Sequence, residues 1–478
     1  MSWGGGELSR GISRRAFIGA AGLGAVGASA WAIDDLVTTR ATTAASADLR
    51  AVVRGRVSLP GDPEFETAGR PWSTAITQQV RAVVELADVD DAAALVRYAR
   101  REGLSLSVQP NGHGASDDLR GVILVRTSRL DAVRVDPAAR TARVGAGVAW
   151  GRLLAEAGPH GLTGLAGSSP VVNVTGFCLG GGLSWFGRKH GWAADSVTAF
   201  DIVDADGRPD RITATSDPDL FWAMRGGGGD FALVTAVDFD LHPAPAVFGG
   251  RMMWPGTAAS AIMTAFRDVT ADAPDELTVW FQRFQPPGSP DAITSILVTY
   301  LGDEARGRAL LSVFDSIPGR LEDTRRMMPI ADVGQIALEP TDPTPEMFAS
   351  ELLTEIDDHT AQALLQPITP LLAMEIRHLG GAFARPSDSA AGQLTAPYCL
   401  IAVGMVTTPD SKAAIEARRQ QYRADLHPVL AGRSPFTFLT PGDTAARAFP
   451  PAALTRLRAI KRNRDPHTVI RANYPVLA

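Results

Sequence analysis

Three glycine-rich segments constrain this chain more than any other feature of its sequence. Glycine adopts positive φ angles freely and lets another group approach the main chain closely. Clustered main-chain amides bind phosphate, so these segments suit a long ligand with a pyrophosphate and a flat ring system. Tight turns at a domain edge are the alternative explanation. The segments read "NGHG" (111–114), "GLAGSSPVVNVTGFCLGGGLSWFGRKHGWAAD" (164–195) and "RGGGGDF" (225–231).

Other ligand-binding motifs are incomplete in this chain. The segment "VGAGVAWG" places Trp150 where a dinucleotide-binding GxGxxG turn needs a small residue. The segment "GSSPV" lacks the second glycine of a serine-hydrolase elbow, and no phosphate-binding GxxxxGK[ST] loop is present. The eight histidines and two cysteines show no metal-ligand spacing. We therefore expect neither a hydrolase nor a metal site.

The pattern of segments predicts two domains and a returning tail. Residues 75–245 alternate short strand-like and helix-like segments, with hairpin turns at Asp136-Pro137 and Asp206-Gly207. In residues 246–448, the runs "ELTVWFQRF", "ITSILVTYLG" and "APYCLIAVGMV" alternate with helical patterns, which predicts an antiparallel sheet covered by helices. Residues 449–478 read as a helix that ends before Asp465-Pro466, followed by a tail.

The N-terminus resembles an export signal. Residues 13–18 read "SRRAFI", and the glycine- and alanine-rich run that follows is too short and weakly apolar for a stable membrane anchor. We expect residues 1–47 to be a twin-arginine signal and linker, cleaved after Ala30 or Ala47. The protein would then meet the twin-arginine machinery and reach the periplasm or the exterior. A plain basic N-terminus is the alternative.

The charge balance argues against a nucleic-acid partner. The net charge is −6, and no basic run follows the N-terminal segment. A nucleic-acid-binding protein normally carries a basic patch or stripe. The hydrophobic content of 45% is that of an ordinary globular protein with a core.

The order of the glycine segments resembles one family of flavoproteins. The chain contains, in order, "NGHG", "GSSPVVNVTGFCLGGGLSWFGRKHGWAADSV", "DLFWAMRGGGGDFALVT" and "RLRAIKRNRDP". This series is similar to that of the berberine-bridge-like flavin oxidoreductases, over roughly residues 75–245 and 370–478. The resemblance implies an α+β fold. A PCMH-type FAD-binding domain (the vanillyl-alcohol-oxidase fold) of two α/β subdomains would join a substrate domain with an antiparallel sheet covered by helices. The C-terminal segment would return to the FAD domain.

The same resemblance implies FAD with one covalent bond, formed by His113. Asn111 stands where relatives have a glycine and Gln109 where many have an arginine. Ser169 occupies the position of a cysteine that forms a second link in many relatives, so no second bond is expected. Cys178 fits a small buried side chain better than the missing thiol. The cofactor-binding residues implied are Asn111, Gly112, His113, Gly114, Ser169, Val172, Gly176, Gly180, Gly181, Gly182, Gly226, Gly227 and Asn473.

The resemblance also implies an oxidation in which hydride leaves a substrate carbon while a base takes a proton. The predicted strand "APYCLIAVGMV" contains no acid, so Tyr398 and Tyr474 are the candidate bases, with Arg377 or His378 as helpers. Phe449 stands where a tyrosine would be useful. A tyrosine needs help to act as a base because its ordinary pKa is near 10.

The expected activity is that of an exported oxidase. It would oxidise a hydroxyl- or amine-bearing small molecule and reduce O2 to H2O2. In relatives, valine at the position of Val172 tends to admit oxygen, whereas leucine tends to block it. A flavin dehydrogenase with another electron acceptor and a catalytically degenerate flavin-binding protein are the alternatives.

Overall fold

The first sheet places the His113 turn at the end of a parallel strand. The structure, a computed structural model, describes residues 49–289 and 291–478, so the predicted signal lies outside the described residues. Strands β2, β4 and β3 run parallel, with β1 antiparallel at the edge. The turn directly follows β3, at the carboxyl end of the strand, where α/β sheets bind ligands. The elements are β1 (Arg56–Ser58), α2 (Phe65–Gly69), β2 (Ala82–Glu85), α3 (Val89–Arg101), β3 (Leu106–Val108) and β4 (Ile123–Arg126).

The second sheet is antiparallel and is built from hairpins around a central strand. Its order is β5-β6-β10-β8-β9. Both predicted hairpins are confirmed: Asp136 ends β5, and Gly207 adopts a φ of +79° in the turn between β8 and β9. The elements are β5 (Val133–Asp136), β6 (Thr141–Gly145), α4 (Trp150–Ala157), β7 (Leu162–Thr163), α5 (Val174–Leu179), α6 (Gly187–His190), β8 (Val197–Val203), β9 (Pro209–Ile212), α7 (Pro218–Met224), β10 (Leu233–Asp240) and β11 (His242–Pro243).

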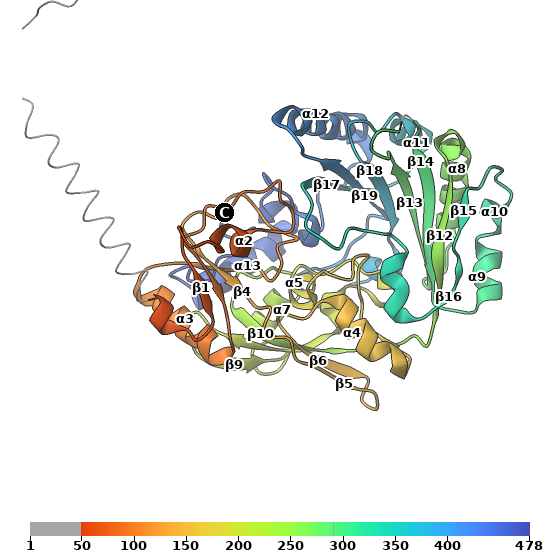
Figure 1. Ribbon diagram of the computed structural model, residues 1–478. Helices are drawn as coiled ribbons and strands as arrows, with labels where there is room; N and C mark the ends of the chain where they lie inside the picture. The colour runs from red at the N-terminus through yellow and green to blue at the C-terminus, as the bar shows by residue number, and fades with distance from the viewer. Residues whose placement is uncertain (1–48, 290) are drawn as a thin grey trace, which may run out of the picture. The chain divides into compact units, whose positions relative to one another are not determined.

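The third sheet is large and antiparallel. Its order is β15-β12-β14-β13-β18-β19-β17, with β16 paired to β12. Figure 1 shows α8, α11 and α12 along one face of this sheet. The elements are β12 (Val247–Pro255), α8 (Ala259–Ala271), β13 (Leu277–Phe284), β14 (Ile293–Tyr300), α9 (Glu304–Leu310), α10 (Ser312–Asp315), β15 (Glu322–Asp323), β16 (Arg326–Met328), β17 (Glu346–Leu353), α11 (Asp358–Leu365), β18 (Ala373–His378), β19 (Tyr398–Met405) and α12 (Pro409–Asp425).

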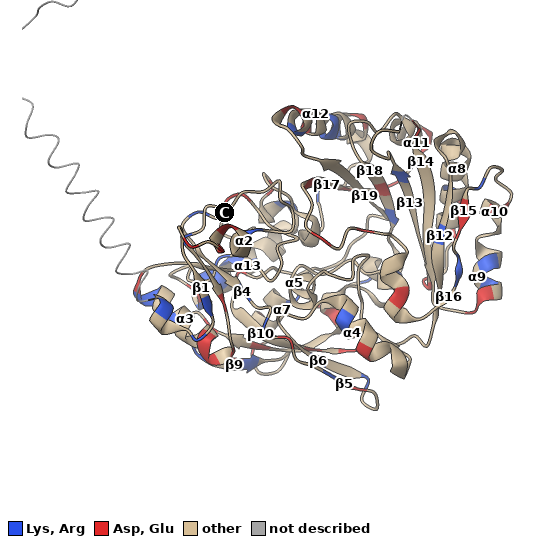
Figure 2. Cartoon of the chain, viewed as in Figure 1, with Lys and Arg blue, Asp and Glu red and all other residues tan. Residues whose placement is uncertain are grey.

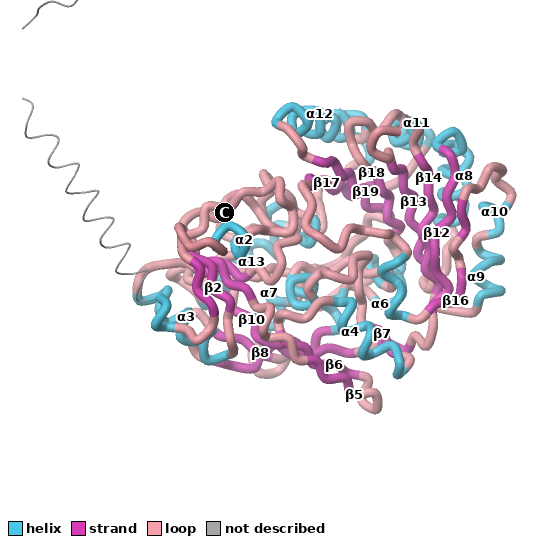
Figure 3. The backbone as a smooth tube through the Cα atoms, in the orientation of Figure 1, coloured by secondary structure: helices cyan, strands magenta, loops and turns pink. Residues whose placement is uncertain are grey.

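The two faces of the large sheet have different environments. Along each strand, alternate side chains point to opposite faces. On β18, Met374 and Ile376 belong to the core beneath the helices, whereas Glu375 and Arg377 face a cavity. Loops make up much of the region on the cavity side (Figure 3).

Arg188 and an indole pair join the large sheet to the glycine-rich side. The guanidinium of Arg188, from α6, donates to the main-chain oxygens of Leu277 (2.8 Å) and Ala273 (3.0 Å). Trp185 stacks on Trp280 of β13 with 3.4 Å between ring centroids. These contacts fix one wall of the cavity against the other.

A buried lysine connects the C-terminal tail to the third glycine-rich segment. Helix α13 (Pro451–Arg464) carries Lys461, whose Nζ donates to Asp465 Oδ2 (2.8 Å) and to the main-chain oxygens of Asp230 and Ile470 (2.5 Å each). The Asp230 carboxylate accepts from the amides of Ala472 (2.9 Å) and Val476 (3.1 Å). The tail therefore returns to the domain of the glycine segments.

The described chain has the α+β fold expected from the sequence. Two smaller sheets carry the glycine segments, and the antiparallel sheet with its helices forms the rest. Basic and acidic residues are interspersed along the elements (Figure 2). Among the described residues, we find no helix with the length and hydropathy of a membrane span.

Candidate active site

A cavity of ≈ 1010 Å³ lies between the glycine-rich loops and the large sheet. One wall comes from the His113 turn, the loop after β7, the last two glycines of the third glycine segment and the C-terminal tail. The other wall is one face of the large sheet. The sheet residues that line it are Arg251, Met253, Gln282, Phe284, Ile293, Ser295, Glu322, Glu346, Phe348, Ala373, Glu375, Arg377, Ile401, Val403 and Met405.

The His113 turn is built around a glycine and an asparagine. Gly112 has a φ of +80°, and a Cβ there would lie 2.8 Å from Pro71 Cα, so no other residue fits. Asn111 Nδ2 donates to the main-chain oxygen of Val171 (2.7 Å), and its Oδ1 lies 3.1 Å from His113 Nδ1. Asn111, which departs from the family pattern, thus holds the turn and the imidazole.

The imidazole of His113 is buried and incompletely bonded. It stacks on Trp72 with 4.1 Å between ring centroids, and its Nε2 has no hydrogen-bond partner among the described residues. Burial lowers the pKa of His113 to about 4, so the ring is neutral near pH 7. A buried polar atom without a partner costs about 1–3 kcal/mol, and the site therefore suits a ligand that engages this ring.

The glycine segments divide into cavity-lining and packing residues. Gly114, Gly176 and Gly180, for which cofactor binding stays a prediction, line the cavity, and so do Gly228 and Gly229, which the sequence reasoning did not single out. Four predicted cofactor-binding glycines do not line it. A Cβ at each would meet protein atoms, so close packing of chain against chain explains them. They are Gly181 and Gly226 (against Ala391), Gly182 (against Phe177) and Gly227 (against Ala223 and Leu457).

Ser169 and Val172 lie on the cavity wall, and their cofactor-binding role stays a prediction. The hydroxyl of Ser169 is buried and has no hydrogen-bond partner among the described residues. Cys178 is also buried and does not line the cavity, and burial raises the pKa of its thiol to about 12. A neutral buried thiol agrees with a packing role for this cysteine.

The C-terminal tail brings Asn473 and Tyr474 to the cavity. Asn473 Oδ1 accepts from the amide of Ser116 (3.2 Å) and from Gln109 Nε2 (3.3 Å). The Tyr474 hydroxyl donates to the main-chain oxygen of Ala115 (3.2 Å), and burial raises the pKa of this phenol. Tyr474 therefore lines the site but is unsuited to take a proton there.

Tyr398 and His378 lie on the wrong face of the sheet for chemistry in the cavity. Tyr398 packs near Phe266, and its hydroxyl lies 2.8 Å from Thr270 Oγ1 of α8. His378 Nε2 lies 2.9 Å from Arg188 Nη1, and burial holds the pKa of His378 well below its usual range. The prediction that these side chains act on the substrate is wrong because both point toward the helices. Phe449 likewise does not line the cavity; it packs against Phe436.

The acids missing from the predicted strand are supplied by its neighbours. Glu375 lies on β18, Glu346 begins β17, and Glu339 lies in the loop before β17; all three line the cavity. The alternation of Met374-Glu375-Ile376-Arg377 was the signal for a strand with one polar face. The sequence analysis looked for an acid only on the β19 segment and so missed these three.

Arg377 organises this acidic wall. Its Nε donates to Glu375 Oε1 (2.6 Å), and its Nη2 donates to Ser168 Oγ (3.3 Å). The guanidinium lies between Trp280 and Phe438, 4.0 and 5.3 Å from their ring centroids. Gln282 Nε2 donates to the other oxygen of Glu375 (3.3 Å). The Glu375 side chain is thus held in a fixed orientation.

The remaining two acids are held in less favourable surroundings. Desolvation raises the pKa of Glu339, against the opposing effect of Arg377. Desolvation also raises the pKa of Glu346, and the nearby Glu339 adds to this rise. The cavity therefore combines a fixed carboxylate, two more weakly stabilised ones and a glycine-rich wall.

Among known protein families, one family model matches the part of the chain that contains the first two glycine-rich segments. Residues 80–213 match the "FAD binding domain" model. An (R)-6-hydroxynicotine oxidase of Paenarthrobacter nicotinovorans is 31% identical over 235 residues, which cover 47% of this chain and 50% of that protein. An FAD-dependent monooxygenase of Fusarium proliferatum is 35% identical over 199 residues, covering 41% and 38%. The chain thus spans half or less of the length of these curated relatives.

Solved structures share the fold over most of the chain. BBE-like 1 of Physcomitrella patens superimposes with a TM-score of 0.79 at 21% identity, covering 90% of this chain and 98% of that one. The 6-hydroxy-D-nicotine oxidase of Arthrobacter nicotinovorans gives a TM-score of 0.76 at 21% identity, covering 88% and 97%. At these identities the likeness concerns the fold.

Proposed function

We propose that this chain, which belongs to the berberine-bridge-like family of FAD-linked oxidoreductases, is an exported oxidase of a hydroxyl- or amine-bearing small molecule. One observation carries the proposal. A single cavity has the His113 turn and glycine loops on one wall and the Glu375–Arg377 pair on the other. A redox cofactor and a substrate would meet between these walls.

The residues on the glycine-rich wall fit a flavin. Gly114 and Gly229 leave main chain open at the cavity, and the buried Ser169 hydroxyl and His113 Nε2 have unused hydrogen-bonding capacity. When bound, FAD supplies the hydride acceptor of the reaction. The neutral ring of His113 keeps a lone pair near pH 7, which supports the proposal that this residue forms the covalent bond.

Glu375 is the residue best placed to take the substrate proton. Its carboxylate lines the cavity and accepts from both Arg377 and Gln282. These bonds orient it while leaving further lone pairs on its oxygens. A general base must meet its proton at hydrogen-bond distance, and the substrate-facing sheet holds Glu375 at the wall where a substrate would lie.

Oxygen use and export complete the proposal. Val172 lines the cavity, and valine at this position tends to admit oxygen in relatives. The "SRRAFI" segment supports export of the folded protein to the periplasm or exterior. The partners would be a small-molecule substrate, oxygen and the twin-arginine machinery.

The test is the mass and colour of the mature protein. Intact-mass measurement of yellow wild-type protein should show one added FAD, and the colour should stay with the polypeptide after acid precipitation. The His113→Ala variant should lose the added mass. An unmodified mass in yellow wild-type protein would remove the covalent bond from the proposal, and a colourless, flavin-free protein would overturn the function itself.

A further inference from the structure

The cavity carries more negative than positive side chains. Its lining includes four carboxylates (Glu322, Glu339, Glu346 and Glu375) and two guanidiniums (Arg251 and Arg377). Arg251 Nε pairs with Glu322 Oε2 at 2.8 Å, and Arg377 pairs with Glu375 at 2.6 Å. Four carboxyl groups against two guanidiniums leave two, Glu339 and Glu346, without an arginine partner within hydrogen-bond distance.

Glu339, one of these two acids, lies near Arg377 and Ser168, and neither forms a close ion pair with it. Glu339 Oε1 lies 3.8 Å from Arg377 Nη2, at the outer limit of an ion pair and beyond hydrogen-bond distance. The Ser168 hydroxyl bonds to Glu339, and this neutral donor leaves the acid without a cation within hydrogen-bond distance. A donor-bearing, cationic group would supply one.

Glu339 is brought to the cavity by a strained loop. The preceding residue, Leu338, has a φ of +52°, which non-glycine residues rarely adopt and which typically reflects a functional constraint. Leu338 is also 62% exposed and lines the cavity, as does Leu321 at 61%. These two leucines are the most exposed large apolar side chains of the described chain, and Leu338 directly precedes the acid.

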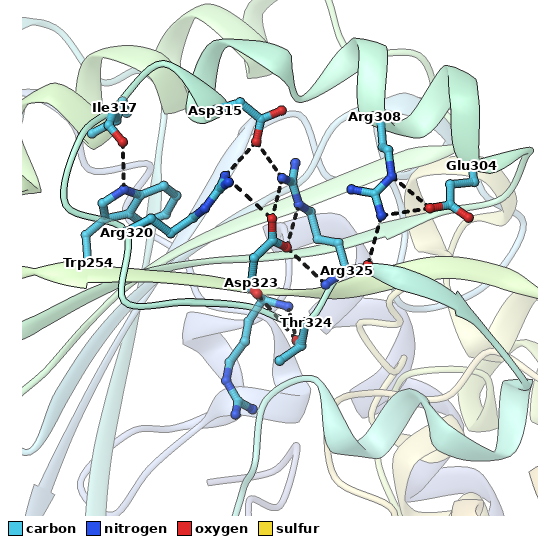
Figure 4. A network of polar contacts seen from close by, with 10 residues as sticks. Trp254, Glu304, Arg308, Asp315, Ile317, Arg320, Asp323, Thr324 and Arg325 are labelled. Atoms are coloured by element: carbon cyan, nitrogen blue, oxygen red, sulfur yellow. Dashed lines mark hydrogen bonds and ion pairs between the residues drawn. The ribbon is translucent and has the colours of Figure 1, made fainter.

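The segment that carries Leu321 is held by a network of ion pairs (Figure 4). Arg325, whose side chain is 1% exposed, pairs with Asp315 (2.6 Å) and Asp323 (2.7 Å). Arg320 also pairs with Asp315 (2.6 Å). These arginines lie on either side of Leu321 in the chain and are held by ion pairs. The exposed Leu321 side chain therefore belongs to an ordered segment.

We propose that Glu339 binds the ammonium group of a cationic substrate whose apolar part covers Leu321 and Leu338. The inference rests on the proposed function, since the same cavity would hold the cofactor. It narrows the substrate class: an amine with an apolar body is favoured over a neutral alcohol because it gives Glu339 a cationic partner, and a carboxylate is disfavoured because it brings no such partner. Glu346 adds to the attraction from the neighbouring position.

The test compares three probes with one apolar frame, namely 4-phenylbutylamine, 4-phenylbutanol and 4-phenylbutyrate. Isothermal titration of the purified, flavin-loaded protein should give about tenfold tighter binding for the amine than for the alcohol, and none for the acid. Glu339→Gln should reduce the preference for the amine severalfold or more. Glu304→Gln, which removes a charge from the same lobe outside the cavity lining, is the matched control and should keep the preference.

Equal affinity for amine and alcohol, absence of binding by both, or an unchanged preference in Glu339→Gln would overturn the inference. These outcomes are separate from failure of the proposed function, which the absence of flavin would show. Circular dichroism and flavin content of each variant establish that the folded holoprotein is compared. Tighter binding of the acid than of the amine would also overturn it.

Discussion

Val172 is a single wall residue from which oxygen reactivity can be tested. It lines the cavity, and its main-chain oxygen accepts from the Trp150 amide at 3.0 Å, so the backbone there is fixed. One added methylene beside a fixed backbone fills space that a diatomic molecule needs. We expect Val172→Leu to slow reoxidation of the reduced flavin about tenfold and to leave FAD content unchanged. Stopped-flow mixing with aerated buffer measures this. Sluggish reoxidation of the wild type would instead favour the dehydrogenase alternative.

The residues of the candidate site differ in how readily they could be predicted. The His113 turn, Ser169 and Val172 follow from local motifs, and all lie at the cavity. Tyr398 could not be placed correctly because both faces of β19 are apolar, so the sequence contains no signal for which face meets the cavity. Glu339 lies in an irregular loop, and its position depends on contacts between distant segments.

At the scale of elements, α13 and the tail depend on the buried Lys461. Lys461→Met would leave the Asp465 carboxylate without its cation and two main-chain oxygens without a donor. Removing one partner of such a buried pair typically costs about 3–5 kcal/mol. We expect this loss in the free energy of unfolding, together with lower flavin content, because the tail carries Asn473. Urea unfolding followed by flavin fluorescence measures it. Arg462→Met, at an exposed position of the same helix, should change stability by less than about 0.5 kcal/mol, and an equal loss there would contradict the explanation.

Elements were predictable where the local pattern was strong. Strands β13, β14 and β19 and both hairpins of the second sheet match the predicted runs. Strands β12, β17 and β18 were not identified, since glycines interrupt the first and charged residues the other two. Their pairing with β14, β19 and β13 stabilises them as strands, and that pairing joins residues far apart in the chain. The predicted domain boundaries near residues 245 and 449 stay predictions.

At the scale of the whole molecule, export is the property to test. If the twin-arginine system reads "SRRAFI", changing Arg14 and Arg15 together to Lys should keep the precursor in the cytoplasm. The trapped protein should still be yellow, because this pathway carries proteins that are already folded. Cell fractionation with detection of the flavin measures both properties. Normal export of the double variant would show that these arginines are not the signal.

The alternation along the large sheet has a consequence for how such an enzyme diversifies. On β19, Ile401, Val403 and Met405 line the cavity, whereas Leu400 and Ala402 pack beneath the helices. The cavity-facing residues of these strands can therefore change with the substrate, while the residues between them, which face the helices, preserve the fold. A combinatorial library limited to the cavity-facing positions would explore new specificities at little cost in stability. Selection in nature has the same route open to it.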